Sequence, residues 1–229
     1  MTARAERLPR GTSEAAWTAP PADCPLCPRL ASFRADNQAR FPGYHNAPVP
    51  SFGVLEARLL VLGLAPGLHG ANQTGRPFTG DYAGDLLYPT LQEEGWAEGV
   101  YDRRSDDGFR LLDCRITNAV RCVPPQNKPI GSEIATCRPF LQDELRAMPN
   151  LRAVLALGRI AHDQLLSTLG HRRAAFPFAH GALHELPDGL LLADSYHCSR
   201  YNVNTGRLTA PMFQAVVRTI RERLRDESR

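Results

Sequence analysis

Six cysteines are the residues of this sequence with the most evident capacity for chemistry, at positions 24, 27, 114, 122, 137 and 198. Cys24 and Cys27 form a C-x2-C pair, and fourteen residues separate Cys122 from Cys137. Four thiolates can hold a structural zinc ion or an iron–sulfur cluster. The spacing alone leaves zinc and a cluster undecided, and Cys122 and Cys137 could instead be unpaired structural cysteines.

Two other uses of these cysteines are less favoured by their surroundings. A redox C-x-x-C motif normally follows a strand, and the residues before Cys24 show none. The first 23 residues lack the apolar core of a signal peptide, which argues against a disulfide framework. Cys114 lies inside an apolar run and is expected to be a small core residue.

A glycine-rich stretch, "GLAPGLHGANQTGRPFTGD" (63–81), is the second chemical candidate. It matches neither the P-loop pattern nor the dinucleotide pattern G-x-G-x-x-G. Its glycines would let a ligand approach the backbone closely, and free N–H groups there can bind an anion. Phe78, beside Pro77, suggests a stacking face, whereas the alternative is a flexible surface loop.

The elements that must position these residues follow from the apolar runs. Runs at 58–65, 111–120, 151–158 and 189–197 are apolar throughout, which is typical of parallel strands covered on both faces. Helical patterns lie at 82–96, 132–148, 159–170 and 210–227, with Ser132 as a plausible N-cap. We therefore predict an α/β fold: a three-layer α/β/α sandwich with a central, mainly parallel four-stranded sheet.

Three of the four predicted strands end in unusual sequence, in the segments 63–81, 117–129 and 196–209. Ligands of such sheets bind at the carboxyl ends of the strands. We expect a flexible tail at 1–22 and one domain at 23–229, because no repeat or linker divides the chain. No apolar run approaches the roughly 20 residues that span a bilayer, so we expect no membrane partner.

The charge of the chain gives weaker guidance, since the net charge is only +3. Lys128 is the only lysine, so 26 of the 27 basic residues are arginine. Arginine grips phosphate and stacks on bases, which suits nucleic-acid binding. A GC-rich genome, whose codons favour arginine, is the better explanation of this bias taken alone.

Taken in order, "GLAPG", "GRPFTGD", "ITNAVRCVPPQNKP" and "HCSRYNVNTGRLT" resemble the motifs of the uracil-DNA glycosylase superfamily, and most closely its iron–sulfur family five, or type B. The resemblance covers residues 24–220. It implies a monomeric, cytoplasmic, nucleoid-associated repair enzyme of a bacterium or archaeon that flips uracil out of DNA and excises it. Deaminated purines such as hypoxanthine are further implied substrates. It also implies that Cys24, Cys27, Cys122 and Cys137 hold a [4Fe-4S] cluster, with zinc as the alternative.

The resemblance assigns roles to single residues. Asn118 falls where the family reads the base edge, and an amide can both donate and accept there. Phe78 falls where an aromatic ring stacks on the extruded base, and His197 where a histidine donates to the base oxygen. The backbone expected below the sugar belongs to Gly63, Ala65 and Gly67.

The water-activating group is not evident, because Ala65 stands where other branches of the superfamily carry Asp, Asn or Glu. Asn72 and Asp81 are the replacement candidates. We prefer Asn72, which can hold a water molecule, since Asp81 could simply cap the following helix. Cys198 stands where the family has proline, and as the neighbour of His197 on an extended segment it should point away from the site.

The segment 199–209 is expected to be a polar loop that contacts DNA. Its candidates for gripping phosphates are Arg200, Tyr201, Asn202 and Arg207, with Tyr201 or Arg200 as the wedge in the space left by the base. Two rival functions remain at this stage. One is a non-catalytic nucleic-acid-binding module with a structural metal, and the other is a redox or electron-transfer protein.

Overall fold

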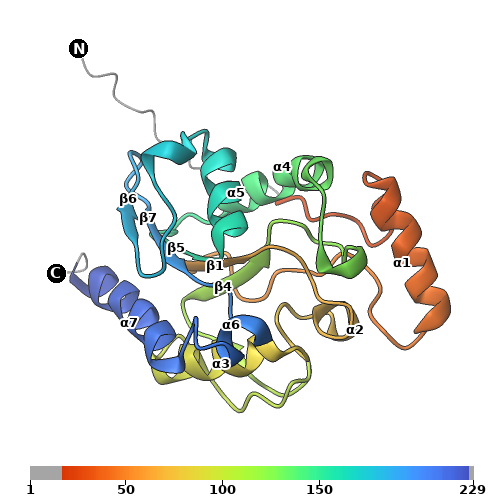
Figure 1. Ribbon diagram of the computed structural model, residues 1–229, viewed down its shortest axis with the longest axis horizontal. Helices are drawn as coiled ribbons and strands as arrows, with labels where there is room; N and C mark the ends of the chain where they lie inside the picture. The colour runs from red at the N-terminus through yellow and green to blue at the C-terminus, as the bar shows by residue number, and fades with distance from the viewer. Residues whose placement is uncertain (1–16, 227–229) are drawn as a thin grey trace.

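A five-stranded sheet forms the centre of the computed structural model, which describes residues 17–226 (Figure 1). The strand order is β4-β1-β5-β7-β6. The first four strands are parallel, and β6 runs antiparallel to β7. Their bounds are β1 Leu59–Gly63, β4 Cys114–Asn118, β5 Ala153–Leu157, β6 Leu183–Glu185 and β7 Leu191–Ser195. The α/β class and the four parallel strands are confirmed, but the sheet has a fifth strand that the sequence did not predict.

Helices surround this sheet, and their bounds are α1 Pro28–Arg40, α2 Ala71–Thr74, α3 Tyr82–Glu93, α4 Gly131–Ala147, α5 Arg159–Leu169, α6 Arg200–Asn204 and α7 Ala210–Asp226. A small separate ribbon pairs β2 Ala97–Glu98 with β3 Arg110–Leu111. One expected cap is wrong: α4 begins before Ser132, and its first turn is closed by Glu133, which accepts from the Ile130 N–H at 2.9 Å. The predicted loop at 199–209 contains the short helix α6.

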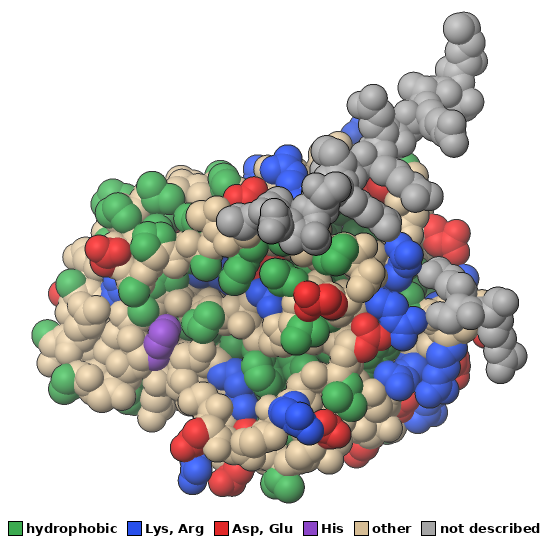
Figure 2. Space-filling view, turned by 180° about the vertical axis from the view of Figure 1, so that it is seen from behind, with side chains coloured by type: hydrophobic (Ala, Val, Ile, Leu, Met, Phe, Trp, Pro, Cys, Tyr) green, Lys and Arg blue, Asp and Glu red, His purple; other side chains and the backbone are tan. Residues whose placement is uncertain are grey.

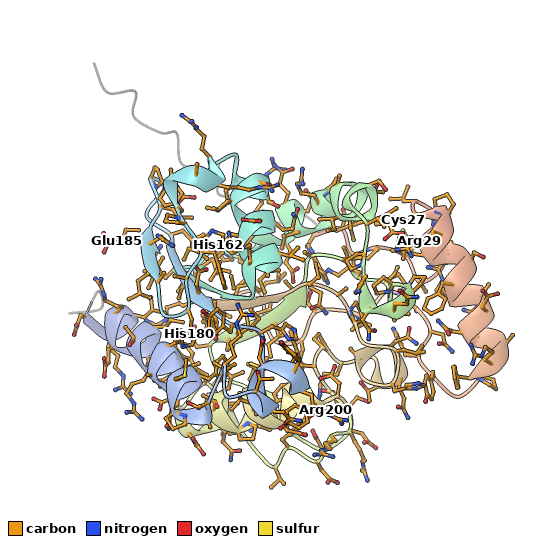
Figure 3. The ribbon with its side chains drawn as sticks, in the orientation of Figure 1. Cys27, Arg29, His162, His180, Glu185 and Arg200 are labelled. Atoms are coloured by element: carbon orange, nitrogen blue, oxygen red, sulfur yellow. The ribbon has the colours of Figure 1, made fainter. Side chains whose placement is uncertain are left out.

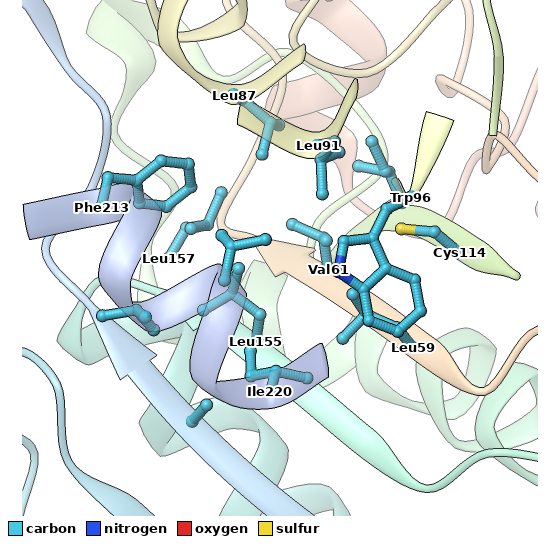
Figure 4. Packing of buried hydrophobic residues seen from close by; sticks show 14 of the residues in the cluster. Leu59, Val61, Leu87, Leu91, Trp96, Cys114, Leu155, Leu157, Phe213 and Ile220 are labelled. Carbon is cyan, nitrogen blue, oxygen red and sulfur yellow. The ribbon is translucent and has the colours of Figure 1, made fainter. Parts of the chain in front are cut away.

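Both faces of the sheet are buried, which explains why the strand sequences are apolar throughout. Leu59 and Val61 belong to the core under α3 and α7, which also holds Cys114, as predicted for this cysteine (Figure 4). Leu60 and Leu62 face the opposite way, into the core beneath α4 and α5. Because successive side chains of a strand alternate between faces, every residue of β1 must be apolar or small.

Trp17, in the last part of the expected tail, contacts the folded domain. Residues 1–16 lie outside the described part of the chain, but the Trp17 ring lies 4.9 Å from the Arg115 guanidinium carbon. From residue 17 onward the chain therefore contacts the domain.

Between residues 17 and 226, no helix is both long and apolar enough to cross a bilayer. Seen from behind, basic side chains gather at the edge of the molecule that carries α7 (Figure 2).

Candidate active site and cysteine cavity

The carboxyl ends of the parallel strands open into a cavity of about 390 Å³. Phe78, Asn118 and His197, which come from three separate segments, all line it. The complete lining is Leu64, Ala65, Pro66, Gly67, Ala71, Phe78, Asp81, Tyr82, Ala83, Asn118, Asn127, His197, Ser199 and Arg200. A cavity of this size, with few polar groups among apolar ones, suits one flat ring system.

Ala65 and Gly67 line the cavity as predicted, whereas Gly63 lies behind two of the lining residues, and the absence of its side chain makes room for them. Gly63 ends β1 and pairs with Asn118 at the end of β4. A Cβ atom at Gly63 would lie 2.3 Å from Asn118 Oδ1 and 2.5 Å from Phe78 Cζ. Glycine therefore allows the amide and the ring to occupy the same corner. Asn118 is 3% exposed, and its Oδ1 has no hydrogen-bond partner among the described residues.

Phe78 is held in an unusual backbone conformation, with φ at 54°. A left-handed conformation costs a non-glycine residue roughly 1 kcal/mol or more, and such residues cluster at functional sites. The Phe78 carbonyl packs so closely on α3 that a Cβ atom at Gly84 would lie 2.0 Å from its oxygen. The Phe78 ring lies 6.1 Å from the His197 ring, at an interplanar angle of 40°.

An ion pair beneath the loop fixes this conformation. Arg76 is 5% exposed and contacts both carboxylate oxygens of Asp107, at 2.8 and 2.7 Å. Its Nε donates to Thr79 Oγ1 at 2.7 Å. Its guanidinium also lies over the rings of Phe52, Tyr88 and Tyr101. Burial would raise the pKa of Asp107, but the hydrogen bonds from Arg76 and from two backbone amides outweigh it and hold that pKa well below its usual range.

His197 follows β7 and faces the Phe78 ring. Burial lowers its pKa, so the imidazole is neutral near pH 7 and can donate one hydrogen bond. Asn202 Nδ2 donates to the His197 carbonyl at 2.9 Å, which fixes the backbone of the histidine. Cys198 is fully buried in the core under α3 and α7, and burial raises the pKa of its thiol. As the sequence indicated, Cys198 does not face the site.

The two candidates for positioning water differ in their placement. Asp81 lines the cavity, and its Oδ1 accepts from the Ala83 N–H at 3.1 Å as the N-cap of α3. Burial raises the pKa of this carboxyl. Asn72 is 1% exposed, lies outside the cavity lining, and donates to Asn46 Oδ1 at 3.0 Å. The placement therefore does not support the preference for Asn72 and favours Asp81.

The predicted DNA contacts differ in exposure. Arg200 lines the cavity (Figure 3), and its guanidinium carbon lies 5.4 Å from the centre of the Tyr82 ring. Tyr201 beside it is 71% exposed. Arg207 is also exposed, with its guanidinium carbon 4.5 Å from the centre of the Tyr196 ring. Of these four residues, Asn202 turns its amide inward, where it donates to the His197 carbonyl.

Tyr82 and Asn127 are among the lining residues that were not predicted. Asn127 lies in the loop after β4, where it and Gln126 both have φ at 56°. The signal was present in "PPQNKP", because asparagine tolerates the left-handed conformation that such a turn needs. Tyr82 opens α3, and its position on the cavity side could not be read from the helical pattern.

Cys24, Cys27, Cys122 and Cys137 line one small apolar cavity, together with side chains such as Leu30. Among the described residues, no three of their sulfur atoms lie within 4.8 Å of one another. A tetrahedral zinc ion would place its sulfurs roughly 3.8 Å apart. The sulfur atoms therefore lie farther apart than in a closed zinc site. Arg34 Nη1 lies 3.8 Å from Cys122 Sγ, and burial, with the neighbouring Cys137, raises the pKa of Cys122 to about 12.

Comparison with known proteins points to one family. The sequence model of the "Uracil DNA glycosylase superfamily" matches residues 50–221. A type-5 uracil-DNA glycosylase of Thermus thermophilus is 49% identical over 199 residues, covering 85% of this chain and 90% of that protein. Type-5 enzymes of Mycobacterium bovis and Pyrobaculum aerophilum are each 42% identical, covering 85% and 86% of this chain and 76% and 87% of the relatives.

Proposed function

The chain belongs to the uracil-DNA glycosylase superfamily, and from this premise we propose how its cavity acts. It is a DNA-repair enzyme that hydrolyses the N-glycosidic bond of uracil in DNA and leaves an abasic site. The observation that supports the assignment of the site is the convergence of Phe78, Asn118 and His197 on one cavity.

The uracil ring enters the cavity only after its nucleotide has swung out of the duplex, because a base stacked inside the duplex cannot reach a pocket in the protein. Phe78 stacks on the ring. The unpaired Asn118 Oδ1 accepts from the N–H of uracil, which satisfies a buried acceptor that otherwise has no partner. Asn118 thus distinguishes uracil by its Watson–Crick edge.

Bond cleavage leaves negative charge on the departing base and positive charge on the sugar. The neutral His197 imidazole donates to a base oxygen, and such a donor contributes roughly 3 kcal/mol when charge develops in a site that excludes water. Asp81 holds the attacking water and stabilises the cationic sugar as a carboxylate. Ala65 leaves the floor of the cavity open, which fits larger bases such as hypoxanthine.

Residues at the mouth of the cavity bind the DNA. Arg200 contacts a phosphate beside the flipped nucleotide, and the exposed Tyr201 ring fills the space that the base leaves in the duplex. The exposed Arg207 is available to a second phosphate, and Asn202 supports this rim from within, since its side chain donates to the His197 carbonyl.

The four cysteines hold a [4Fe-4S] cluster. Their spacing and apolar surroundings suit a cluster better than one zinc ion, and Arg34 is placed to donate to a ligated sulfur. When bound, the cluster links α1 to α4 and to the loop after β4. The excision step itself is carried by the residues of the active-site cavity.

The test is an excision assay on duplex DNA that carries a single uracil, hypoxanthine or xanthine, followed by alkali. Strand cleavage at the uracil is expected for the wild-type chain. Asn118→Ala should lose at least about a hundredfold in uracil excision while it still binds duplex DNA, because one buried donor–acceptor pair with the base is lost. Full activity of Asn118→Ala would show that the base binds elsewhere.

A further inference from the structure

A second group of ligand-type side chains lies on the face of the sheet opposite to α3 and α7. His162 belongs to α5, His184 to β6 and Asp194 to β7. One ligand atom from each of them lies within 4.8 Å of the other two. His162 Nδ1 is 2.7 Å from Asp194 Oδ1, and His184 Nε2 is 3.5 Å from Asp194 Oδ2.

The hydrogen bond on the far side of His162 fixes which nitrogen carries its proton. His162 Nε2 lies 2.9 Å from the Phe176 carbonyl oxygen, which can only accept, so Nε2 is protonated. In the neutral imidazole, the lone pair of Nδ1 then points at the Asp194 carboxylate. A lone pair and a carboxylate at this distance require a cation between them, either a second proton or a metal ion.

Two further atoms indicate whether this cation is a proton or a metal ion. Asp194 is fully buried, yet its Oδ2 has no hydrogen-bond partner among the described residues, and neither has His184 Nε2. A second proton on His162 would satisfy Oδ1 alone, because the 3.5 Å between His184 Nε2 and Oδ2 is too long for a good hydrogen bond. A metal ion between the three side chains would satisfy Nδ1, Nε2 of His184 and the carboxylate together.

We propose that His162, His184 and Asp194 form a binding site for a divalent metal ion, and that the ion is zinc. Two imidazoles and a carboxylate are ordinary zinc ligands, at about 2.0–2.2 Å from the ion. Such ligands on a tetrahedral ion lie about 3.4 Å apart. The observed separations of 2.7 and 3.5 Å lie on either side of this value, so small side-chain movements admit the ion.

The surroundings fit a structural site. A metal-ligating histidine commonly donates its other N–H to a backbone carbonyl, as His162 does to Phe176. The Phe178 ring packs edge-on against His162 at 5.6 Å, and His184 is only 15% exposed. The second oxygen of Asp194 or a water molecule completes the coordination.

The site is separate from both cavities described above. In Figure 3, His162 lies near the strands β6 and β7, whereas Cys27 lies at the opposite side of the molecule, at the start of α1. Zinc here joins α5 to the edge strand β6 and to β7, the strand that leads directly to His197. It thereby holds the end of the sheet that supplies this active-site residue.

The experiment measures zinc and iron separately in the purified, cluster-containing chain after equilibration with zinc sulfate and desalting. We expect about one zinc per wild-type chain. His184→Gln should lower the zinc affinity by at least about tenfold, as even outer contacts to a metal site do, and leave the iron content unchanged. His180→Gln is the matched control, because His180 lies in the loop before β6 but outside the group of three.

Crystals of the zinc-equilibrated wild-type chain provide a second measurement that needs no variant. Anomalous scattering at the zinc edge should place a peak between His162 Nδ1, His184 Nε2 and Asp194. Equal zinc contents in wild type and His184→Gln, or a map without this peak, would show that a second proton on His162 is the cation and would overturn the proposal. Should His184→Gln not fold, the map alone decides.

Discussion

Gly63 determines the shape of the active-site cavity although it has no functional group. Its position at the end of β1 brings its backbone against both Asn118 and Phe78. Its φ is not positive, so backbone strain is not the reason for glycine here. The reason is space, since the nearest atoms would lie far inside the contact distance of a Cβ.

Gly63→Ala should therefore lower excision of uracil by at least about a hundredfold, because the base would meet a displaced ring and a displaced amide, and a small misplacement can cost this much. Single-turnover excision on uracil duplex is the measurement. Gly43→Ala is the control, as nothing lies within 4 Å of its added Cβ. Equal rates for the two variants would contradict the assignment of the cavity.

Asp81 and Asn72 can be separated by the pH dependence of excision. A carboxylate that positions water acts only when ionised, and burial raises the pKa of Asp81 above the usual value of about 3.9. The rate of wild type should thus fall on the acid side at a higher pH than an ordinary aspartate would give. Asp81→Asn should lose about a hundredfold in rate and lose this acid limb.

Asn72→Ala should behave differently in the same pH series. It removes a buried donor to Asn46, so it should lower stability by about 1 kcal/mol and retain the acid limb. If Asn72→Ala loses about a hundredfold in rate across the whole pH series and Asp81→Asn keeps the wild-type rate and acid limb, Asn72 and not Asp81 positions the water.

At the scale of the elements, the loop that carries Phe78 depends on the ion pair of Arg76 and Asp107. Both side chains are buried, at 6% and 1% exposure. Because the pKa of Asp107 is held low when folded, the pair stabilises the protein above the unfolded pKa of about 3.9. This stabilisation is lost as the pH falls through the folded pKa.

Asp107→Asn should accordingly lower the free energy of unfolding by about 3 kcal/mol at pH 7, as removal of one partner from a buried pair does. The gap between the variant and wild type should narrow below about pH 4. Denaturant unfolding between pH 7 and pH 3 measures it. Asp106→Asn, at a side chain 77% exposed, should change little. A gap that is constant with pH would contradict the role of the charge.

The elements also show what a sequence can and cannot predict. The parallel strands were readable because each is covered on both faces and must be apolar. β6 could not be predicted in this way, because it has three residues and two of them, His184 and Glu185, are polar. Asn118 and His197 were located by the motifs at strand ends. The choice between Asn72 and Asp81 depends on which way a loop turns its side chains, and that is set by contacts such as the one with Asn46.

At the scale of the whole molecule, α1 is a long helix with little apolar packing. Its buried residues are Leu30, Arg34 and Asn37, of which only one is hydrophobic. The sheet and the helices on its two faces are held by two large apolar cores. The cysteine cavity lies between α1, α4 and the loop after β4. A cluster bound there would replace the apolar contacts that α1 lacks.

Cys137→Ala should therefore abolish the stoichiometric iron content and release α1 before the rest of the molecule. In hydrogen exchange, the amides of 31–40 should exchange at least about tenfold faster than in wild type, while those of β1 keep their protection, because stability is distributed locally. Cys114→Ala is the matched control, since this cysteine lies in the core under α3 and α7 and should retain iron. If Cys137→Ala keeps its iron, the ligand assignment is wrong. If the variant loses iron but the amides of α1 stay protected, polar contacts hold the helix instead. These are the ion pair of Arg29 with Glu133 and the hydrogen bond from Arg34 to the Cys24 carbonyl. The cluster would then have another role.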